Sequence, residues 1–297
     1  MVVAWDVIGA PSSAGAHTPG VERAPVALRS AGLLELIRRE SPVDDLGDVP
    51  GFRWRPDPAN ARAQNAFDVA RVAADVAERV DRSVRRGRMP LVLGGDCTVT
   101  IGLVAGQARA GARPALVYVD GGPDLYTPET RANGNLDAMG LAHMLALPGC
   151  APPVAAVGPY TPLLTPDEVV YYGGSLPPGD HERDLVEKLS IRYLPAEEVH
   201  ADPAAAATHA RAIAETAAAV FVVHFDVDVL KFVEAPLADV PEPFGLTVAE
   251  ASATLSTLVA SPQFGGMTIT EINPDHLPDP TILPWFTRML SSALAGS

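Results

Sequence analysis

The sequence predicts an α/β fold in which helices cover both faces of one parallel sheet. Short apolar segments suited to buried strands alternate with segments of helical periodicity along all 297 residues. Three of the apolar segments run directly into acids, a cysteine or a histidine, and open α/β sheets bind ligands just past the carboxyl ends of their strands. We therefore expect residues 1–297 to form a single-domain three-layer sandwich with a central parallel sheet and one site at its carboxyl edge.

The expected strands are short, rich in β-branched residues and bounded by glycine, proline or aspartate, as buried parallel strands are. Their segments are 2–8, 42–49, 90–93, 115–119, 154–157, 192–194, 219–227 and 266–272. We take 115–119 as the central strand, because it is apolar throughout and ends in two carboxylates.

The expected helices carry apolar residues three or four positions apart. They cover 25–40, 60–86, a stretch after Thr98, 136–147, 184–189, 203–218, 248–259 and 285–294. The longest, 60–86, is ended by Gly87. The helix 203–218 has two signals of a helix start, Asp202 as a candidate N-cap and Pro203 in its first position.

Composition excludes several classes of protein. The formal net charge of −14 argues against a surface for nucleic acid or for an anionic membrane. No run approaches the roughly 18 apolar residues of a membrane span, and residues 1–20 lack the basic start of a signal peptide. The two cysteines imply no disulfide framework. We therefore expect a cytoplasmic protein whose partner is a small-molecule substrate.

Asp120 and Asp124 directly follow the central strand. Carboxylates two or four residues apart in an extended segment point to the same side, which suits a metal site. Two solvated acids in a Gly/Pro turn are an equally good interpretation of the pair.

His224 and Asp226, near the end of the segment 219–227, and Asp228, directly after it, alternate with hydrophobic residues. In an extended chain all three share one face. Unpaired charge on a buried face is costly, so the pattern favours a functional site. The alternative is an edge strand with a wet face, and the apolar residues that precede His224 argue against it.

Cys97 lies in Gly94-Gly95-Asp96-Cys97, where a strand turns into a helix. Backbone N–H groups and the helix dipole favour an anion there and would lower the pKa of the thiol. Cys97 could then be a metal ligand or a nucleophile, or it could be a small buried hydrophobe. Glu271 is a lone acid at the end of the last strand and a weaker signal, and Cys150 is assigned no role.

Together these segments resemble the ureohydrolase superfamily, the family of arginases and agmatinases. The resemblance spans most of the chain and keeps the order of the family's motifs. The matching segments are 8–15, 20–29, 45–48, 94–97 (Gly-Gly-Asp-Cys for Gly-Gly-Asp-His), 120–124 (Asp-Gly-Gly-Pro-Asp for Asp-Ala-His-x-Asp), 133–140, 226–228, 242–247 and 271–274. It implies an arginase-like fold and a homo-oligomer, a trimer or a hexamer.

The resemblance also implies two manganese ions, held by two histidines and four aspartates, that hydrolyse a guanidino or amidino carbon. Cys97 replaces one histidine with another competent ligand, and Gly122 replaces the other with none. His224 is a candidate substitute, since it shares a strand face with Asp226. We expect one manganese ion rather than two, and binding of none stays open; the matching ligands are Cys97, Asp120, Asp124, Asp226 and Asp228.

The substrate side departs from the family as well. Asp137 stands for the catalytic-loop histidine, and Glu271 matches the acid that faces the guanidine. Tyr126 replaces an asparagine that holds the substrate carboxylate in arginases, and residues 157–161 replace Gly-x-Arg-Asp without its charged pair. The resemblance therefore implies that the substrate is not free arginine. It implies a larger or an uncharged molecule that carries a guanidino, amidino or amide group, such as a specialised metabolite.

Three functions stay open. The first is a metal-dependent hydrolase of linear amidines or guanidines. In the second, Cys97 is the nucleophile and His224 its base, in a metal-independent acyl or amidino transfer or a ring closure. The third is a non-catalytic homologue. The candidate catalytic residues are Cys97, Asp124, Asp137, His224 and Glu271.

Overall fold

A computed structural model describes residues 3–295, whose eight strands form one sheet. The strand order is β2-β1-β3-β8-β7-β4-β5-β6, and neighbouring strands are parallel throughout. The predicted parallel α/β sandwich is therefore confirmed. The strands are β1 (Trp5–Gly9), β2 (Val43–Asp48), β3 (Met89–Leu93), β4 (Ala115–Val119), β5 (Val169–Tyr172), β6 (Arg192–Leu194), β7 (Phe221–Asp226) and β8 (Phe264–Thr270).

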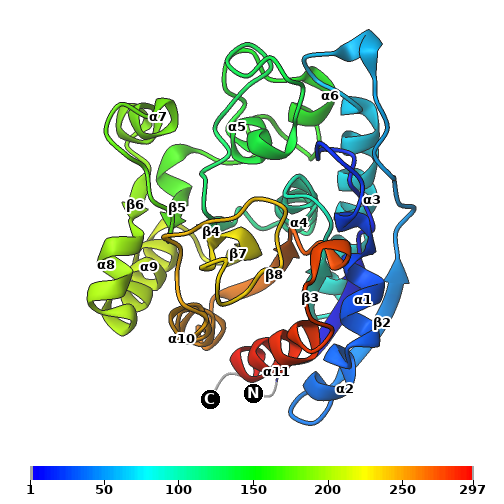
Figure 1. Ribbon diagram of the computed structural model, residues 1–297, viewed down its shortest axis with the longest axis vertical. Coiled ribbons are helices and arrows are strands. Elements are labelled where there is room, and N and C mark those ends of the chain that lie inside the picture. Colours follow the sequence, from blue (N-terminus) through cyan, green and yellow to red (C-terminus); the bar gives the residue numbers. More distant parts are fainter. Residues whose placement is uncertain (1–2, 296–297) are drawn as a thin grey trace.

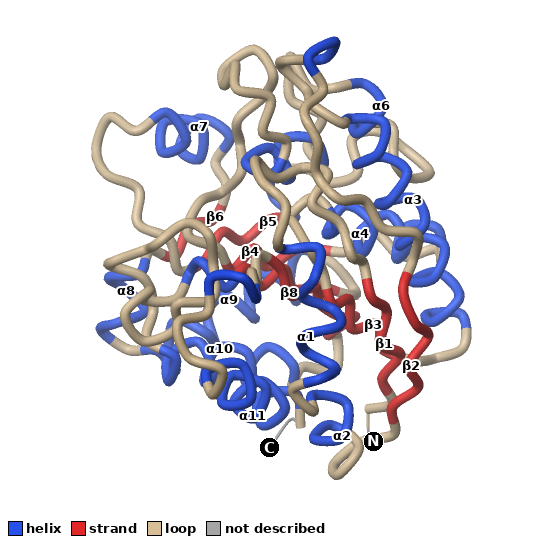
Figure 2. Tube along the Cα trace, turned by 45° about the vertical axis from the view of Figure 1, so that its right-hand side comes forward, coloured by secondary structure: helices blue, strands red, loops and turns tan. Residues whose placement is uncertain are grey.

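The helices form a layer on each face of the sheet (Figure 1). One layer holds α1 (Ala24–Ser30), α2 (Leu33–Ile37), α8 (Ala196–Ala201), α9 (Pro203–Ala217), α10 (Val248–Val259) and α11 (Ile282–Leu294). The other holds α3 (Ala66–Arg85), α4 (Val99–Arg109), α5 (Gly140–Met144), α6 (Pro152–Ala155) and α7 (His181–Leu189). Figure 2 shows the strands crossing the middle of the molecule between helices. Within residues 3–295, no helix combines the length and the apolar character needed to cross a bilayer.

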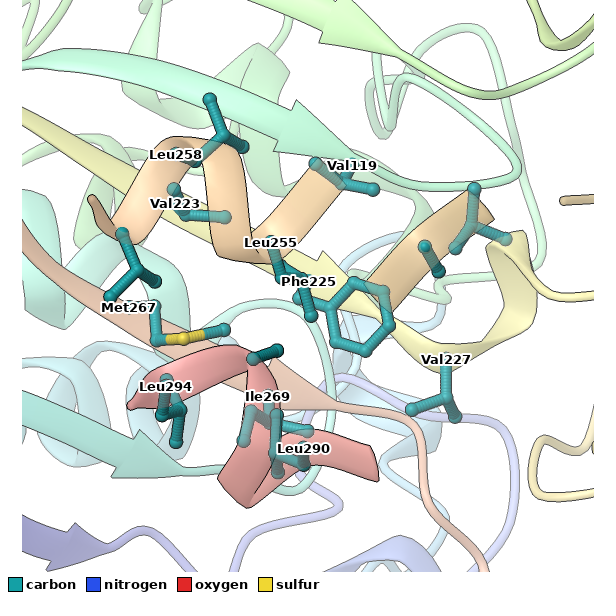
Figure 3. Packing of buried hydrophobic residues seen from close by; sticks show 14 of the residues in the cluster. Val119, Val223, Phe225, Val227, Leu255, Leu258, Met267, Ile269, Leu290 and Leu294 are labelled. Carbon is teal, nitrogen blue, oxygen red and sulfur yellow. The ribbon is translucent and has the colours of Figure 1, made fainter. Parts of the chain in front are cut away.

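Two clusters of buried hydrophobic residues, one for each helical layer, form the core. Figure 3 shows part of the first, where Val223 and Phe225 of β7 pack with Leu255 of α10 and Leu290 of α11. Because side chains alternate along a strand, the same packing turns His224 toward the second cluster, where its ring stacks on that of Tyr118. The core thereby decides which face of β7 carries the polar residues.

Three of the predicted helices are shorter than expected. The segment 25–40 breaks into α1 and α2, because Gly32 takes a left-handed conformation with φ of 85° between them. The segment 60–86 becomes helical only at Ala66, after Asn65 with φ of 56°, although α3 is still the longest helix described. Within 136–147, only a 3-10 turn at Asp137–Met139 and the short α5 are helical.

The strand predicted at 154–157 is wrong. Pro152–Ala155 is helix α6, which starts with prolines in its first turn. The strand that pairs with β4 on this side is β5, Val169–Tyr172, which was not predicted, and neither was α8. Residues 157–161 therefore do not follow a strand. The segment that follows β5 is 173–176, Gly-Gly-Ser-Leu, and it too lacks a charged pair.

Truncation of Phe286 tests the core between α11 and the sheet. Its side chain is fully buried, so Phe286→Ala should lower the free energy of unfolding by about 3–5 kcal/mol. Phe67→Ala is the matched control, because Phe67 is 72% exposed on α3 and its loss should change stability by no more than about 0.5 kcal/mol. Denaturant unfolding followed by circular dichroism measures both, and equal losses would contradict this packing.

Candidate active site

The candidate site lies at the carboxyl edge of four strands that are neighbours in the sheet, in the order β3-β8-β7-β4. Cys97 follows β3, Glu271 follows β8, His224 and Asp226 end β7, and Asp120 follows β4. Parallel pairing brings these ends to one edge although Cys97 and Glu271 are far apart in the chain. The structure therefore brings these five residues to the edge that the sequence predicted, and their functions stay predictions.

Cys97, Asp120, His224 and Asp226 form the tightest group of donors. One donor atom from each lies within 4.8 Å of every other, and all four residues are buried. The Cys97 Sγ is 2.6 Å from Asp226 Oδ2, and His224 Nε2 is 2.9 Å from Asp120 Oδ2. A thiol, an imidazole and two carboxylates are ligands for a divalent transition metal.

Among the residues that the structure describes, no lysine or arginine neutralises the acids of this group. Burial, and then the neighbouring carboxylates, raise the pKa of Asp120 and of Asp226 well above the ordinary range. Among residues 3–295, the only ion-pairing group in contact with either acid is the imidazole of His224. A bound cation would supply the missing positive charge, so the residues present fit a metal ion.

Asp137 and Glu271 face Cys97 in a second group. One atom from each of the three lies within 4.8 Å of the others. The Cys97 N–H donates to Asp137 Oδ1 at 2.7 Å, whereas Glu271 Oε1 is buried without a hydrogen-bond partner in the described chain. Glu271 also has φ of 64°, a conformation rare for a residue with a side chain. An unpaired carboxylate held this way can accept N–H groups from a ligand.

Asp124 and Asp228 lie beside these groups rather than inside them. Asp124 has φ of 51° and its Oδ2 accepts a hydrogen bond from the Tyr118 hydroxyl at 2.5 Å. Asp228 belongs to a 3-10 turn, Val227–Val229, and its Oδ1 accepts from Gly121 N at 3.1 Å. The period-2 argument is therefore wrong for both residues, because turns rather than extended chain position them. Their roles as ligands stay predictions.

The expectation of a lowered thiol pKa at Cys97 is wrong. Burial raises the pKa of Cys97 well above its ordinary value, and the nearby Asp226, Asp137, Asp120 and Asp124 raise it further. These charges outweigh the start of α4, which begins only at Val99. Without a cation the thiol is neutral and donates to Asp226.

His224 is also not placed to act as a base for Cys97. Its Nε2 is bonded to Asp120, and its Nδ1 is 2.6 Å from the Thr100 hydroxyl. Burial lowers the pKa of His224 to about 3, so the ring is neutral. The geometry therefore gives the proposed Cys97–His224 pair no proton-transfer contact.

Gly122 leaves open space beside the acids. A Cβ added there would meet only Glu182 Oε2, at 3.9 Å. Gly95 is the opposite case, since a Cβ would lie 1.7 Å from the carbonyl oxygen of Ser12, so only glycine fits this approach of the N-terminal loop to the site.

Sequence reasoning missed Glu182, a buried acid on α7 whose Oε1 accepts from Leu125 N at 2.8 Å. Burial raises its pKa to about 7. Thr100 and Thr268 were missed as well. Thr268 had a signal in the alternation Met267-Thr268-Ile269-Thr270, which places two hydroxyls on the face that carries His224, whereas the burial of Glu182 has no local signature.

Known proteins resemble this chain over nearly its full length. The model described as "Arginase family" matches residues 4–291. Arginase-1 of Homo sapiens is 31% identical over 299 residues, which cover 97% of this chain and 90% of the human protein. Arginase of Bacillus caldovelox is 32% identical over 278 residues, 90% of each chain. Its solved structure superimposes with a TM-score of 0.86 at 27% identity, covering 99% of this chain and 98% of that chain.

The clustered acids make the stability of the metal-free protein depend on pH. Burial raises the pKa of Asp96 to about 7 and that of Asp137 to about 6, from an ordinary 3.8. At a pH between the ordinary pKa and these raised values, the native state binds more protons than the unfolded state. The free energy of unfolding therefore falls as pH rises through this window. Acids whose pKa is lowered in the native state, such as Asp6, make the free energy of unfolding rise with pH instead. They titrate below this window and so do not affect the slope within it.

We therefore expect the Tm of chelator-treated protein to fall as the pH is raised from about 5 to about 8. Added manganese should reverse the trend, because ligands must lose their protons to bind it. Thermal unfolding in matched buffers measures both slopes. A Tm that rises across this range without metal would contradict the protonation states described.

Proposed function

The chain belongs to the arginase family, and we propose that it hydrolyses a carbon–nitrogen bond in a guanidino or amidino group with the help of a bound divalent cation. Membership of this family supports a hydrolase. The observation that carries the proposal is the buried group Cys97, Asp120, His224 and Asp226, whose donor atoms lie within 4.8 Å of one another.

The donor set favours one cation over two. Cys97 supplies a soft ligand and the aspartates hard ones, so manganese, cobalt and zinc are all candidates. Gly122, at the position of the family's second ligand histidine, offers no side-chain ligand for a second cation. When bound, the cation would act as a Lewis acid and make water a better nucleophile at neutral pH.

The second group would hold the substrate. Glu271 has a buried carboxylate oxygen without a hydrogen-bond partner in the described chain. A carboxylate oxygen of Asp137 lies within 4.8 Å of a carboxylate oxygen of Glu271. Two carboxylates accept N–H groups from a planar cationic guanidinium or amidinium, whose charge would return Glu271 to its ionised form. Asp137, with its pKa raised to about 6 mainly by burial, is suited to carry a proton during the reaction at neutral pH.

Aromatic and charged side chains near Asp124 support a substrate other than free arginine. The Tyr126 ring stacks on His181 with centroids 5.5 Å apart, and the Arg131 guanidinium lies 4.8 Å from the Tyr126 ring centroid. A flat or apolar part of the substrate would pack beside these stacked side chains. A specialised metabolite that carries a guanidino, amidino or amide group fits such an arrangement.

Asp226→Asn tests the metal requirement. The exchange keeps the shape of the side chain but removes a charged ligand, so metal affinity should fall by more than about 100-fold, with turnover lost alongside. Asp184→Asn is the control, because Asp184 is exposed on α7. Metal content per chain by mass spectrometry, and urea or ammonia release from a panel of guanidino and amidino compounds, measure the two effects. Full turnover by Asp226→Asn or in chelator would overturn the proposal.

Gly122→His tests the number of ions. A Cβ there meets only Glu182 Oε2, at 3.9 Å, and a carboxylate beside a ligand histidine can accept its free ring N–H. We expect the metal content to rise from about one to about two ions per chain. Gly122→Ala fills the same space without a donor and should leave the content unchanged. A wild-type content of two, or no gain with histidine, would show that position 122 does not limit the site.

A further inference from the structure

We propose that His224 is a positioning residue for Asp120 rather than a metal ligand. This inference rests on the proposed function, because it concerns how the chain prepares one carboxylate of that site to bind a cation. His224 belongs geometrically to the group of four donors, yet both of its ring nitrogens are already bonded within the protein.

A buried chain of hydrogen bonds leads from the core to Asp120. Thr268 Oγ1 is 2.7 Å from Thr100 Oγ1, which is 2.6 Å from His224 Nδ1, and His224 Nε2 is 2.9 Å from Asp120 Oδ2. Thr100, His224 and Thr268 have no exposed surface, and Asp120 is 2% exposed. These hydrogen bonds join β8, α4, β7 and the end of β4, so they hold both ring nitrogens of His224.

The direction of these bonds follows from the chemistry of Asp120. A carboxylate that binds a cation is ionised and can only accept, so His224 Nε2 must carry the ring proton. The neutral ring has one such proton, so Nδ1 accepts from the Thr100 hydroxyl, which in turn accepts from Thr268. Each side-chain polar atom in this series of hydrogen bonds then has a hydrogen-bond partner, as buried polar groups usually do.

The contact leaves Asp120 free to bind. Its Oδ1 accepts from Gly122 N at 2.8 Å and its Oδ2 from His224, and each carboxylate oxygen keeps a second lone pair. The Tyr118 ring holds the plane of the imidazole, with centroids 4.0 Å apart and an interplanar angle of 15°. If Nε2 were to bind the cation instead, Asp120 would lose this donor and Nδ1 would have to reverse its bond with Thr100.

The first experiment is calorimetric titration of Mn²⁺ into metal-free protein. His224→Ala should weaken binding by about 10–100-fold without changing the stoichiometry, as loss of a group that orients a ligand does. His224→Gln, whose side-chain N–H₂ can reach Asp120, should recover part of the affinity. Thr100→Val, which removes the hydroxyl bonded to His224 Nδ1, should also weaken binding. His143→Gln is the control, since His143 is a buried histidine bonded to Met139 O and Ala151 N.

The second experiment reads the ring directly. In ¹⁵N-labelled protein loaded with ¹¹³Cd²⁺, the signals absent from His224→Gln identify His224. We expect a proton on Nε2 and no ¹⁵N–¹¹³Cd coupling. A coupling to His224, or unchanged affinity in both His224→Ala and Thr100→Val, would overturn this inference while leaving the hydrolase proposal standing. A wild-type protein that binds neither Mn²⁺ nor Cd²⁺ would overturn both. Thermal unfolding checks that each variant is folded.

Discussion

Buried negative charge without a basic partner is the constraint on which the rest of this site depends. Asp120, Asp226 and Glu271 are all buried, and in the described chain no lysine or arginine pairs with them. Burial raises the pKa of each, and their mutual repulsion adds to the effect. The cluster is stable either with protons on it or around a cation. Burial and then the same charges keep the Cys97 thiol neutral, whereas burial keeps the His224 ring behind Asp120 neutral in spite of these charges.

Much of the fold could be predicted from periodicity, because the buried strands and long helices have strong local patterns. α10 was predicted with its bounds, and Asp202 caps α9 by accepting from Ala205 N. Short elements were less predictable. The apolar run 154–157 has the composition of a strand, but the prolines before it start a helix, whereas Val169–Tyr172 becomes a strand through pairing with β4 and β6. Such pairing is a long-range effect that local sequence does not contain.

The candidate site was predictable in its members but not in its internal contacts. Alternation correctly placed His224 and Asp226 on the polar face of β7, yet it could not reveal that His224 binds Asp120 and Thr100 rather than Cys97. The pKa of Cys97 was mispredicted for a related reason. The start of a helix is visible in the sequence, but the four aspartates that surround the thiol come from three other segments of the chain. Contacts between segments decide the chemistry here.

The place of β8 in the sheet bears on how the protein is made. Phe264–Thr270 comes last along the chain among the eight strands described, yet it lies between β3 and β7 and joins two halves of the sheet. Until it emerges from the ribosome, no strand pairing joins β2-β1-β3 to β7-β4-β5-β6. Such a late, long-range closure is slow compared with local folding. A nascent chain therefore exposes the inner edges of β3 and β7 together, which makes this stage of biogenesis the one most in need of a chaperone.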